Sequence, residues 1–336
     1  MKYLSGVPLV LILQASIWLP GQLCAANLQA AVQSPDVPGA AVVWQSPKAE
    51  HVYGLPDVKH NKKGTLTLSA DALTFMGKSA NTSIPRSSVT AVSAGNERVE
   101  LWGVGGRLMR MAIPDGGGVA AAAVMHHRVD MLTVEFHDNR GADHAAVFLL
   151  PANEADRALK DFVVAPATSL KAAEVGCQNE LIEPKSVLVA APNWDNAEVP
   201  AAYRALVYEH LIARLRSAKD VSHVYRDGEV SGKSACPQYT VHISIATFKE
   251  GSSVKRAALG PIGMFVGTTQ MKFDVTFTDA SGKLNDSEQI KATMRGENES
   301  TDVADHVAKS VAKHYAKALK NADKSISAKK TGDTVS

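Results

Sequence analysis

The sequence has little net charge, few aromatic residues and few long apolar runs, and each shortage narrows the possible functions. Its 36 basic and 34 acidic residues leave a formal net charge of +2, so no nucleic-acid partner is expected. Aromatic residues make up 6% of the chain and hydrophobic residues 45%, which indicates mainly aliphatic cores. After the first 25 residues, no segment is apolar over the roughly 20 residues that a transmembrane helix needs. No transmembrane segment is therefore expected after that point.

Cysteine is equally scarce, with three residues in the chain. Cys24 belongs to the leader, and lipidation there is not expected, because Leu23 lies directly before it and not three positions before. Cys177 and Cys236 remain, and a lone pair of thiols in an oxidising compartment usually forms a disulfide. We predict a Cys177–Cys236 disulfide, and two free buried thiols are the alternative.

The first residues resemble an export signal. Lys2 provides a positive start, Val7 to Leu19 is mostly apolar, and small residues follow, with Ala25 or Ala26 as the last residue removed. Residues 1–25 are therefore predicted to be a signal peptide, and an uncleaved anchor is the alternative. The expected location is the periplasm or the extracellular space. Residues 26–50 are expected to be unstructured or extended.

Short β-rich segments dominate residues 51–165, including "GTLTLSADALTFMG", "SIPRSSVTAV" and "MLTVEFHDNRGADHAAVF". The segment "NEADRALKDFVV" closes this region as a predicted helix, with Asn153 as its cap and Ala155, Leu159 and Phe162 as its buried stripe. These segments resemble a bacterial pleckstrin-homology/GRAM-like domain over residues 52–164. The resemblance implies a small β-barrel closed by a helix. Relatives often bind phosphoinositides through basic early loops, but this region offers only Lys78 and Arg86, so that activity is not carried over.

The pattern changes after a predicted linker at residues 166–178. Residues 179–322 contain alternating strands, such as "QYTVHISIATF" and "MKFDVTFTD", and two amphipathic helices, "AEVPAAYRALVYEHLIARLRS" and "TDVADHVAKSVAKHYAKALKN". A sheet with one apolar face needs a cover, so we expect an antiparallel sheet covered by two helices. The whole chain is thus predicted to be α+β, with two domains. Residues 323–336 form a polar tail that is expected to be disordered.

The second domain resembles an exported envelope domain family of unknown function over residues 187–319. The resemblance rests on "FKEGSSVKRAALGPIGMFVG" followed by "MKFDVTFTDASGK". A looser likeness runs to the amino-terminal domain of the periplasmic Tol-system propeller protein. Neither resemblance implies an active site.

The candidate chemistry of the sequence has simple structural explanations. His126 and His127 enter a predicted strand, where neighbouring side chains point to opposite faces, so they are not expected to share a metal ion. The acidic segment "HDNRGADH" (137–144) fits a hairpin turn better than a calcium loop. The glycine-rich segments 103–106 and 114–123 lack the lysine and helix of a phosphate-binding loop. No catalytic residue, metal ligand or cofactor is assigned.

Two surfaces are candidates for contact with a partner. The segment 254–267 is apolar, and its key residues are Lys255, Arg256, Leu259, Ile262, Met264 and Phe265. It is either a contact loop for an envelope protein or lipid surface or a cap over its own core. The lysines at 309, 313, 317 and 320 form a basic stripe, for which a solvated face is the alternative. The sequence favours an exported non-enzymatic binding or scaffold protein of the cell envelope. A hydrolase with an unrecognised site and a lipid-binding module remain alternatives.

Overall fold

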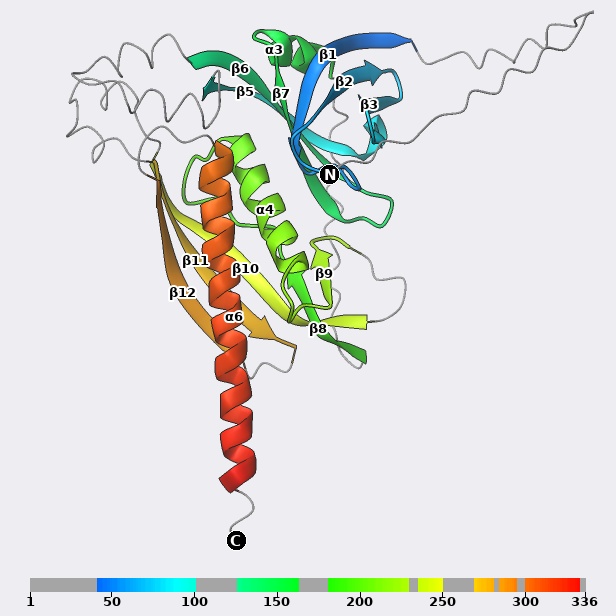
Figure 1. Cartoon of the computed structure of the whole chain (residues 1–336). Coiled ribbons are helices and arrows are strands. Elements are labelled where there is room, and N and C mark those ends of the chain that lie inside the picture. Colours follow the sequence, from blue (N-terminus) through cyan, green and yellow to red (C-terminus); the bar gives the residue numbers. More distant parts are fainter. Residues whose placement is uncertain are drawn as a thin grey trace, which may run out of the picture. The chain divides into compact units, whose positions relative to one another are not determined.

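The computed structural model describes residues 41–100, 126–162, 181–229, 235–249, 269–280, 284–294 and 300–332. These residues form three α-helices and two β-sheets, one of seven and one of five strands (Figure 1). The α+β class predicted from the sequence is confirmed. The predicted linker, residues 166–178, lies outside the described residues.

The first sheet is antiparallel throughout, with the strand order β4-β3-β2-β1-β7-β6-β5. Its strands are β1 (Val42–Tyr53), β2 (Lys62–Ser69), β3 (Ala72–Gly77), β4 (Asn81–Pro85), β5 (Val89–Glu100), β6 (His126–His137) and β7 (Asp143–Leu150). β2 and β3 pair as a hairpin within the predicted β-rich segment. The hydroxyl of Ser69 holds its turn by accepting hydrogen bonds from the backbone N–H groups of Asp71 and Ala72.

The connectivity of the first sheet requires it to roll. β4 and β5 are its two edge strands, yet only the three-residue 3-10 helix η1 (Arg86–Ser88) separates them in the sequence. Three residues span roughly 10 Å at most, so the end of β4 and the start of β5 must lie close together. The sheet encloses its own hydrophobic core, to which Leu66, Phe75, Leu132 and Phe148 contribute fully buried side chains.

The helix α3 (Glu154–Asp161) packs against β1, β5 and β6, as the sequence predicted, but two details differ. Asn153 occupies the cap position in a left-handed conformation, with φ of 68°, and its side chain makes no cap hydrogen bond. Asp130 of β6 instead accepts the hydrogen bond from the backbone N–H of Ala155 at 3.1 Å. Leu159, predicted to be buried, is 38% exposed, because the helix buries Ala158 in its place.

The strand β1 lies mostly within the segment 26–50 that was expected to be unstructured or extended. The sequence did not predict this strand, because proline disfavours strand interiors and Pro47 lies in its middle. A register shift between Ser46 and Ala49 accommodates the proline. The result is a bulged strand that pairs with both β2 and β7.

The second sheet has the strand order β12-β11-β10-β8-β9. Its strands are β8 (Leu181–Val189), β9 (His223–Arg226), β10 (Ala235–Lys249), β11 (Thr269–Asp279) and β12 (Asn285–Met294). The prediction of an antiparallel sheet is wrong for half of it, because β8 pairs in parallel with both β10 and β9. Parallel neighbours need a crossover connection, and helix α4 (Ala201–Arg216) provides it between β8 and β9. The four residues of β9 gave no recognisable strand pattern.

The alternation predicted for the long strands is confirmed. Val241, Ile243 and Ile245 of β10 are buried. Met271, Phe273, Val275 and Phe277 of β11 are buried as well. Helix α6 (Ser300–Gly332) packs on β11, β12 and α4, and α4 and α6 cover the second sheet (Figure 1). The predicted two-helix cover is therefore present.

Helix α6 is longer than expected, because its backbone continues to Gly332 and so includes most of the tail that was expected to be disordered. The added residues 323–332 include three lysines and one alanine, which are good helix formers. Among the described residues, no helix combines the length and the apolar character needed to cross a bilayer.

Helix α4 is buried on more than one side. Leu206, Val207, Leu211, Ile212 and Leu215 are all buried, because α4 contacts β1, β6 and β7 of the first sheet as well as α6 and β9. The hydrophobic cluster around α4 accordingly includes four side chains of the first sheet, namely Val52, Met131, Ala145 and Val147. The contact between α4 and the first sheet is where the candidate site lies.

Candidate functional site

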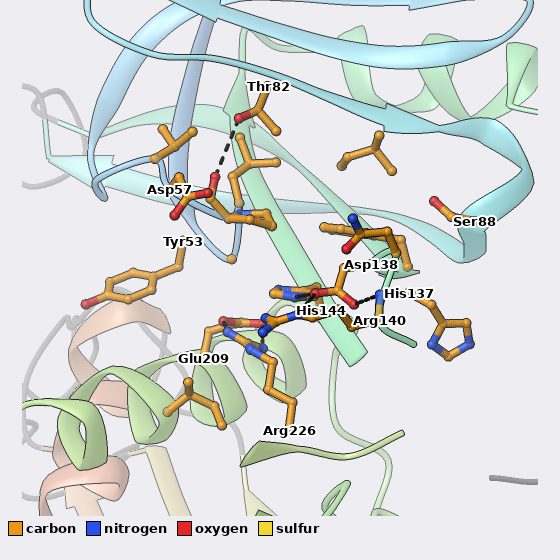
Figure 2. Close-up of a pocket in the computed structure, with 18 of the residues that line it drawn as sticks. Tyr53, Asp57, Thr82, Ser88, His137, Asp138, Arg140, His144, Glu209 and Arg226 are labelled. Carbon is orange, nitrogen blue, oxygen red and sulfur yellow. Dashed lines mark hydrogen bonds and ion pairs between the residues drawn. The ribbon is translucent and has the colours of Figure 1, made fainter. Parts of the chain in front are cut away.

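A cleft of about 1210 Å3 lies between the first sheet and α4 (Figure 2). Four segments far apart in the sequence line it: the β1–β2 loop from 53 to 60, the β4–η1 corner from 82 to 88, the β6–β7 turn from 136 to 144, and α4 with the end of β9. Leu55, Phe136 and Ile212 contribute apolar surface, and charged side chains gather at the turn and at α4. Side chains from both sheets are therefore needed to build this cleft.

The β6–β7 turn is shaped by Asp138. Its Oδ1 accepts hydrogen bonds from the backbone N–H groups of Arg140 at 2.8 Å and Ala142 at 2.9 Å. Burial raises the pKa of Asp138, but these two backbone donors, His144 and Arg140 outweigh it and hold the pKa below its usual value. The predicted hairpin turn is confirmed, and its aspartate accepts two backbone hydrogen bonds.

A buried ion pair joins this turn to the second half of the chain. Arg226 of β9 donates to both carboxylate oxygens of Glu209 of α4, at 2.8 and 2.6 Å. Their side chains are 5% and 3% exposed. Burial lowers the pKa of Arg226, but the Glu209 carboxylate outweighs it and raises the pKa above its usual value. Arg226 therefore stays charged beside its carboxylate partner.

The same pair bonds the backbone of β7. Glu209 Oε1 accepts a hydrogen bond from the backbone N–H of Ala145 at 3.1 Å, and Arg226 Nη1 donates to the carbonyl oxygen of Asp143 at 2.9 Å. A backbone hydrogen bond from Asp143 N to Asp227 O adds a third link. One ion pair therefore ties α4 and β9 to the first strand residues of β7.

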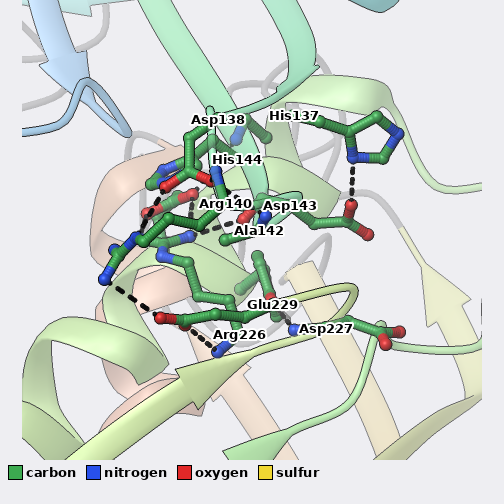
Figure 3. Close-up of polar contacts among 12 residues, drawn as sticks. His137, Asp138, Arg140, Ala142, Asp143, His144, Arg226, Asp227 and Glu229 are labelled. Atoms are coloured by element: carbon green, nitrogen blue, oxygen red, sulfur yellow. Dashed lines mark hydrogen bonds and ion pairs between the residues drawn. The ribbon is translucent and has the colours of Figure 1, made fainter. Parts of the chain in front are cut away.

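Further polar contacts surround this pair (Figure 3). Arg140 Nη1 lies 3.2 Å from Glu229 Oε1, and Glu229 Oε2 accepts a hydrogen bond from the backbone N–H of Arg226. Asp227 accepts hydrogen bonds from the backbone N–H groups of Ala191 and Gly228. The carboxylates near the turn are thus already engaged by groups of the protein.

The β1–β2 loop on the other wall is held by His51, which is fully buried. Its Nε2 lies 3.1 Å from the backbone nitrogen of Leu55 and its Nδ1 lies 3.3 Å from the carbonyl oxygen of Lys59. Nε2 must accept and Nδ1 must donate, which defines the neutral tautomer with the proton on Nδ1. Burial lowers the pKa of His51 to about 4. The neutral imidazole therefore determines the path of a loop that lines the cleft.

This arrangement predicts loss of stability in acid. The folded-state pKa of about 4 lies below the usual histidine value of 6.5, so the unfolded chain binds more protons between these values and folding loses free energy there. Stability should be full above about pH 6.5 and should fall as the pH drops to about 4. Burial also lowers the pKa values of His144 and His210, which adds to the loss in the same direction.

Urea unfolding at several pH values measures this effect. The His51→Gln variant, which has no titrating ring, should show a shallower decline in unfolding free energy than the wild-type chain between pH 6.5 and 4. An identical decline in both proteins would show that His51 does not contribute.

Several titrating groups at the cleft contact one another. His137 Nδ1 lies 2.6 Å from Asp143 Oδ1, and burial raises the pKa of Asp143. His144 stacks on Phe136, and burial followed by repulsion from Arg226 lowers its pKa. The hydroxyl of Ser88 donates to the carbonyl oxygen of Pro85. No activated nucleophile is evident among these described contacts.

Metal binding finds no support in the part of the chain that the structure describes. There, no three His, Cys, Asp or Glu side chains are grouped so that they could hold a metal ion. His126 and His127 enter β6, as predicted from the sequence.

Of the other residues singled out in the sequence, Cys236 and Arg86 do not line the cleft. Cys236 is buried in β10, and its predicted partner Cys177 lies outside the described residues. The contact loop with Lys255, Arg256, Leu259, Ile262, Met264 and Phe265 also lies outside them. Arg86 donates to the carbonyl oxygens of Ser69 and Asp161 and therefore joins the rolled sheet to α3.

The sequence analysis missed Glu209, Arg226, Arg140 and Arg216 as members of one site. A signal was present in α4, where Glu209 and His210 lie within a helix that is apolar on nearly every side. Such a helix is expected to be buried, and a buried glutamate needs a cationic partner. The sequence alone does not show which arginine that partner is.

Comparisons with known proteins leave the family open. No family model matches the sequence, and no curated protein matches it. One solved structure that matches in part is the PelC dodecamer from Paraburkholderia phytofirmans, at 14% sequence identity. The match covers 39% of this chain and 87% of that chain, with a TM-score of 0.28. Another is the hypothetical protein CT253 from Chlamydia trachomatis, with 12% identity, 40% and 96% covered, and a TM-score of 0.28. Similarity at this level supports no functional argument.

Proposed function

We propose that this chain is an exported, non-enzymatic binding or scaffold protein of the cell envelope that engages a partner or ligand in the cleft between the first sheet and α4. The observation that carries the proposal is the cleft itself. It is large, at about 1210 Å3, and open, and segments from both halves of the chain line it. Two of its carboxylates, Asp138 and Glu209, are bonded to arginines, a histidine or backbone N–H groups, which suits a rigid binding surface more than proton transfer.

The two family resemblances are part of this proposal. A pleckstrin-homology/GRAM-like domain over residues 52–164 is supported by the seven-stranded antiparallel sheet, by its rolled shape and by the closing helix α3. An envelope-type domain over residues 187–319 is supported by the helix-covered second sheet.

Export, the Cys177–Cys236 disulfide and the contact loop at 254–267 also remain proposals. The intact mass of the chain recovered from the periplasm should lack residues 1–25 and two thiol hydrogens. A full-length mass would contradict export with removal of the signal peptide. Two alkylatable thiols would contradict the disulfide. Lipid binding through Met264 and Phe265 predicts that their replacement by serine releases the protein from liposomes.

The alternative function is a hydrolase, and one contact favours it. The 2.6 Å approach of His137 Nδ1 to Asp143 leaves Nε2 of the half-exposed His137 ring in the cleft wall, where it would be available as a general base.

Two measurements separate these functions. A purified chain should show no turnover of ester, phosphate, glycoside or peptide substrates. Turnover that is lost in His137→Ala and retained in His306→Ala would establish the hydrolase.

Crosslinking in intact cells followed by affinity capture should yield one envelope partner. Ser87→Trp, which fills the cleft from η1, should remove that partner, and Asp156→Trp, on the exposed face of α3, should retain it. Capture that is equal in both variants would contradict binding in the cleft.

A further inference from the structure

Arg216 is an arginine of the cleft whose charge no carboxylate balances directly. It is the last residue of α4, it is exposed, and it lines the cleft. No ion pair or hydrogen bond joins its side chain to another described residue. Arg214, one half-turn earlier, shows the contrast, because Asp305 of α6 accepts two hydrogen bonds from its Nη2 at 2.6 and 2.7 Å. The carboxyl-terminal end of a helix favours cations, which would explain the presence of Arg214 and of Arg216. It does not explain why Arg216 lines the cleft and Arg214 does not.

The charges around Arg216 explain why it lacks a partner. Its pKa is lowered, first by partial burial and then by repulsion from Arg226, and it also interacts with Glu209, Glu229 and Arg140. Glu209 already accepts hydrogen bonds from Nη1 and Nη2 of Arg226. Glu229 pairs with Arg140 and accepts a hydrogen bond from the backbone N–H of Arg226. The guanidinium groups of Arg140, Arg216 and Arg226 therefore lie near one another at this end of the cleft. The two nearby carboxylates bind Arg226 and Arg140, and neither binds Arg216.

Arg140 lines the same cleft and lies near enough to Arg216 to repel its charge. It lies on the β6–β7 turn, and its side chain remains 56% exposed although it contacts Asp138 and Glu229. Two planar guanidinium groups from different elements can bind one tetrahedral or planar oxyanion through paired N–H donors, which a lysine cannot do. The uncharged residues of the lining, including Ser87, Ile212 and Ala213, leave room for a neutral remainder of the ligand.

We propose that Arg216 and Arg140 form an oxyanion-binding site in the cleft, which recognises a phosphate-type group of the ligand. This inference rests on the proposed binding function and names the chemistry that its site recognises. The group belongs either to a soluble phosphate ester or to an anionic lipid headgroup, and both present the same oxygens to the two arginines.

Calorimetric titration with inorganic phosphate and with glycerol phosphate, at low ionic strength, tests the site. Arg216→Ala and Arg140→Ala should each weaken binding at least 10-fold, since a charge-assisted hydrogen bond contributes roughly that factor. Arg216→Lys should give an intermediate loss, because it keeps the charge without the planar fork. Lys219→Ala removes an exposed charge three residues further along, outside the cleft lining, and should change binding less than twofold.

Sedimentation with vesicles identifies the source of the oxyanion. Preferential binding to phosphatidylglycerol vesicles over phosphatidylcholine vesicles, lost in Arg216→Ala, indicates a lipid headgroup. Binding of the soluble phosphates alone indicates a soluble ester. Unchanged binding in Arg216→Ala, or no binding of any probe by a folded wild-type chain, overturns the inference. If the cleft partner is still captured from cells in that case, the proposed function stands without the oxyanion site.

Discussion

Replacing Glu209 with alanine is expected to lower the free energy of unfolding by about 3–5 kcal/mol, because removing one member of a buried ion pair leaves an uncompensated charge. Arg226 would then remain 5% exposed with the carbonyl oxygen of Asp143 as an acceptor. The backbone N–H of Ala145 would lose its acceptor as well. Because this pair also bonds β7, its loss should loosen the β6–β7 turn that lines the cleft.

Urea unfolding followed by circular dichroism measures this loss. The double variant Glu209→Leu with Arg226→Met should be less destabilised than Glu209→Ala, because it removes both charges together. Asp305→Ala provides the matched control, since its pair with Arg214 is 37% and 45% exposed and such pairs contribute about 0–1 kcal/mol. A loss below about 1 kcal/mol in Glu209→Ala would show that this pair does not join the two halves as described.

The second large effect is expected from Phe273→Ala, at about 3–5 kcal/mol, the usual cost of truncating a buried phenylalanine. Phe273 is fully buried in β11 and meets the edge of Trp194 at 6.1 Å between ring centroids. Phe148→Ala should have a similar cost in the core of the first sheet, where that ring lies 6.0 Å from Phe75.

The two phenylalanine variants also test how independent the two predicted domains are. Since Val52, Met131, Ala145 and Val147 of the first sheet pack in the same cluster as α4, we expect each substitution to lower one shared calorimetric transition. Two separate transitions, of which each variant shifts only one, would show instead that the halves unfold independently.

Much of the fold was predictable because its elements carry regular patterns. Alternation along β10 and β11 predicted both strands and their buried faces, and the four-residue spacing predicted α4 and α6. β1 escaped prediction because Pro47 interrupts it, and β9 because four residues carry too little pattern. The parallel pairing of β8 depends on the crossover through α4, which a strand pattern does not show.

The candidate site was much less predictable, for a physical reason. Its charged groups come from the β6–β7 turn, from α4 and from β9, and only tertiary packing brings these segments together. In the sequence, Asp138 and its neighbours fit an ordinary turn, and they do form one. The partner of the turn is the Arg226–Glu209 pair. Its two members lie 17 positions apart, one on α4 and one on β9, and no pattern in the sequence pairs them.

Site-specific photo-crosslinking in intact cells tests the central claim most directly. Ser87 and Asn139 are exposed residues on opposite walls of the cleft, and Asp156 is an exposed residue of α3 that does not line it. With a photoreactive side chain at each position in turn, we expect the same crosslinked species from Ser87 and Asn139 and none from Asp156. No adduct from the two cleft positions, or equal adducts from all three, would contradict binding in the cleft.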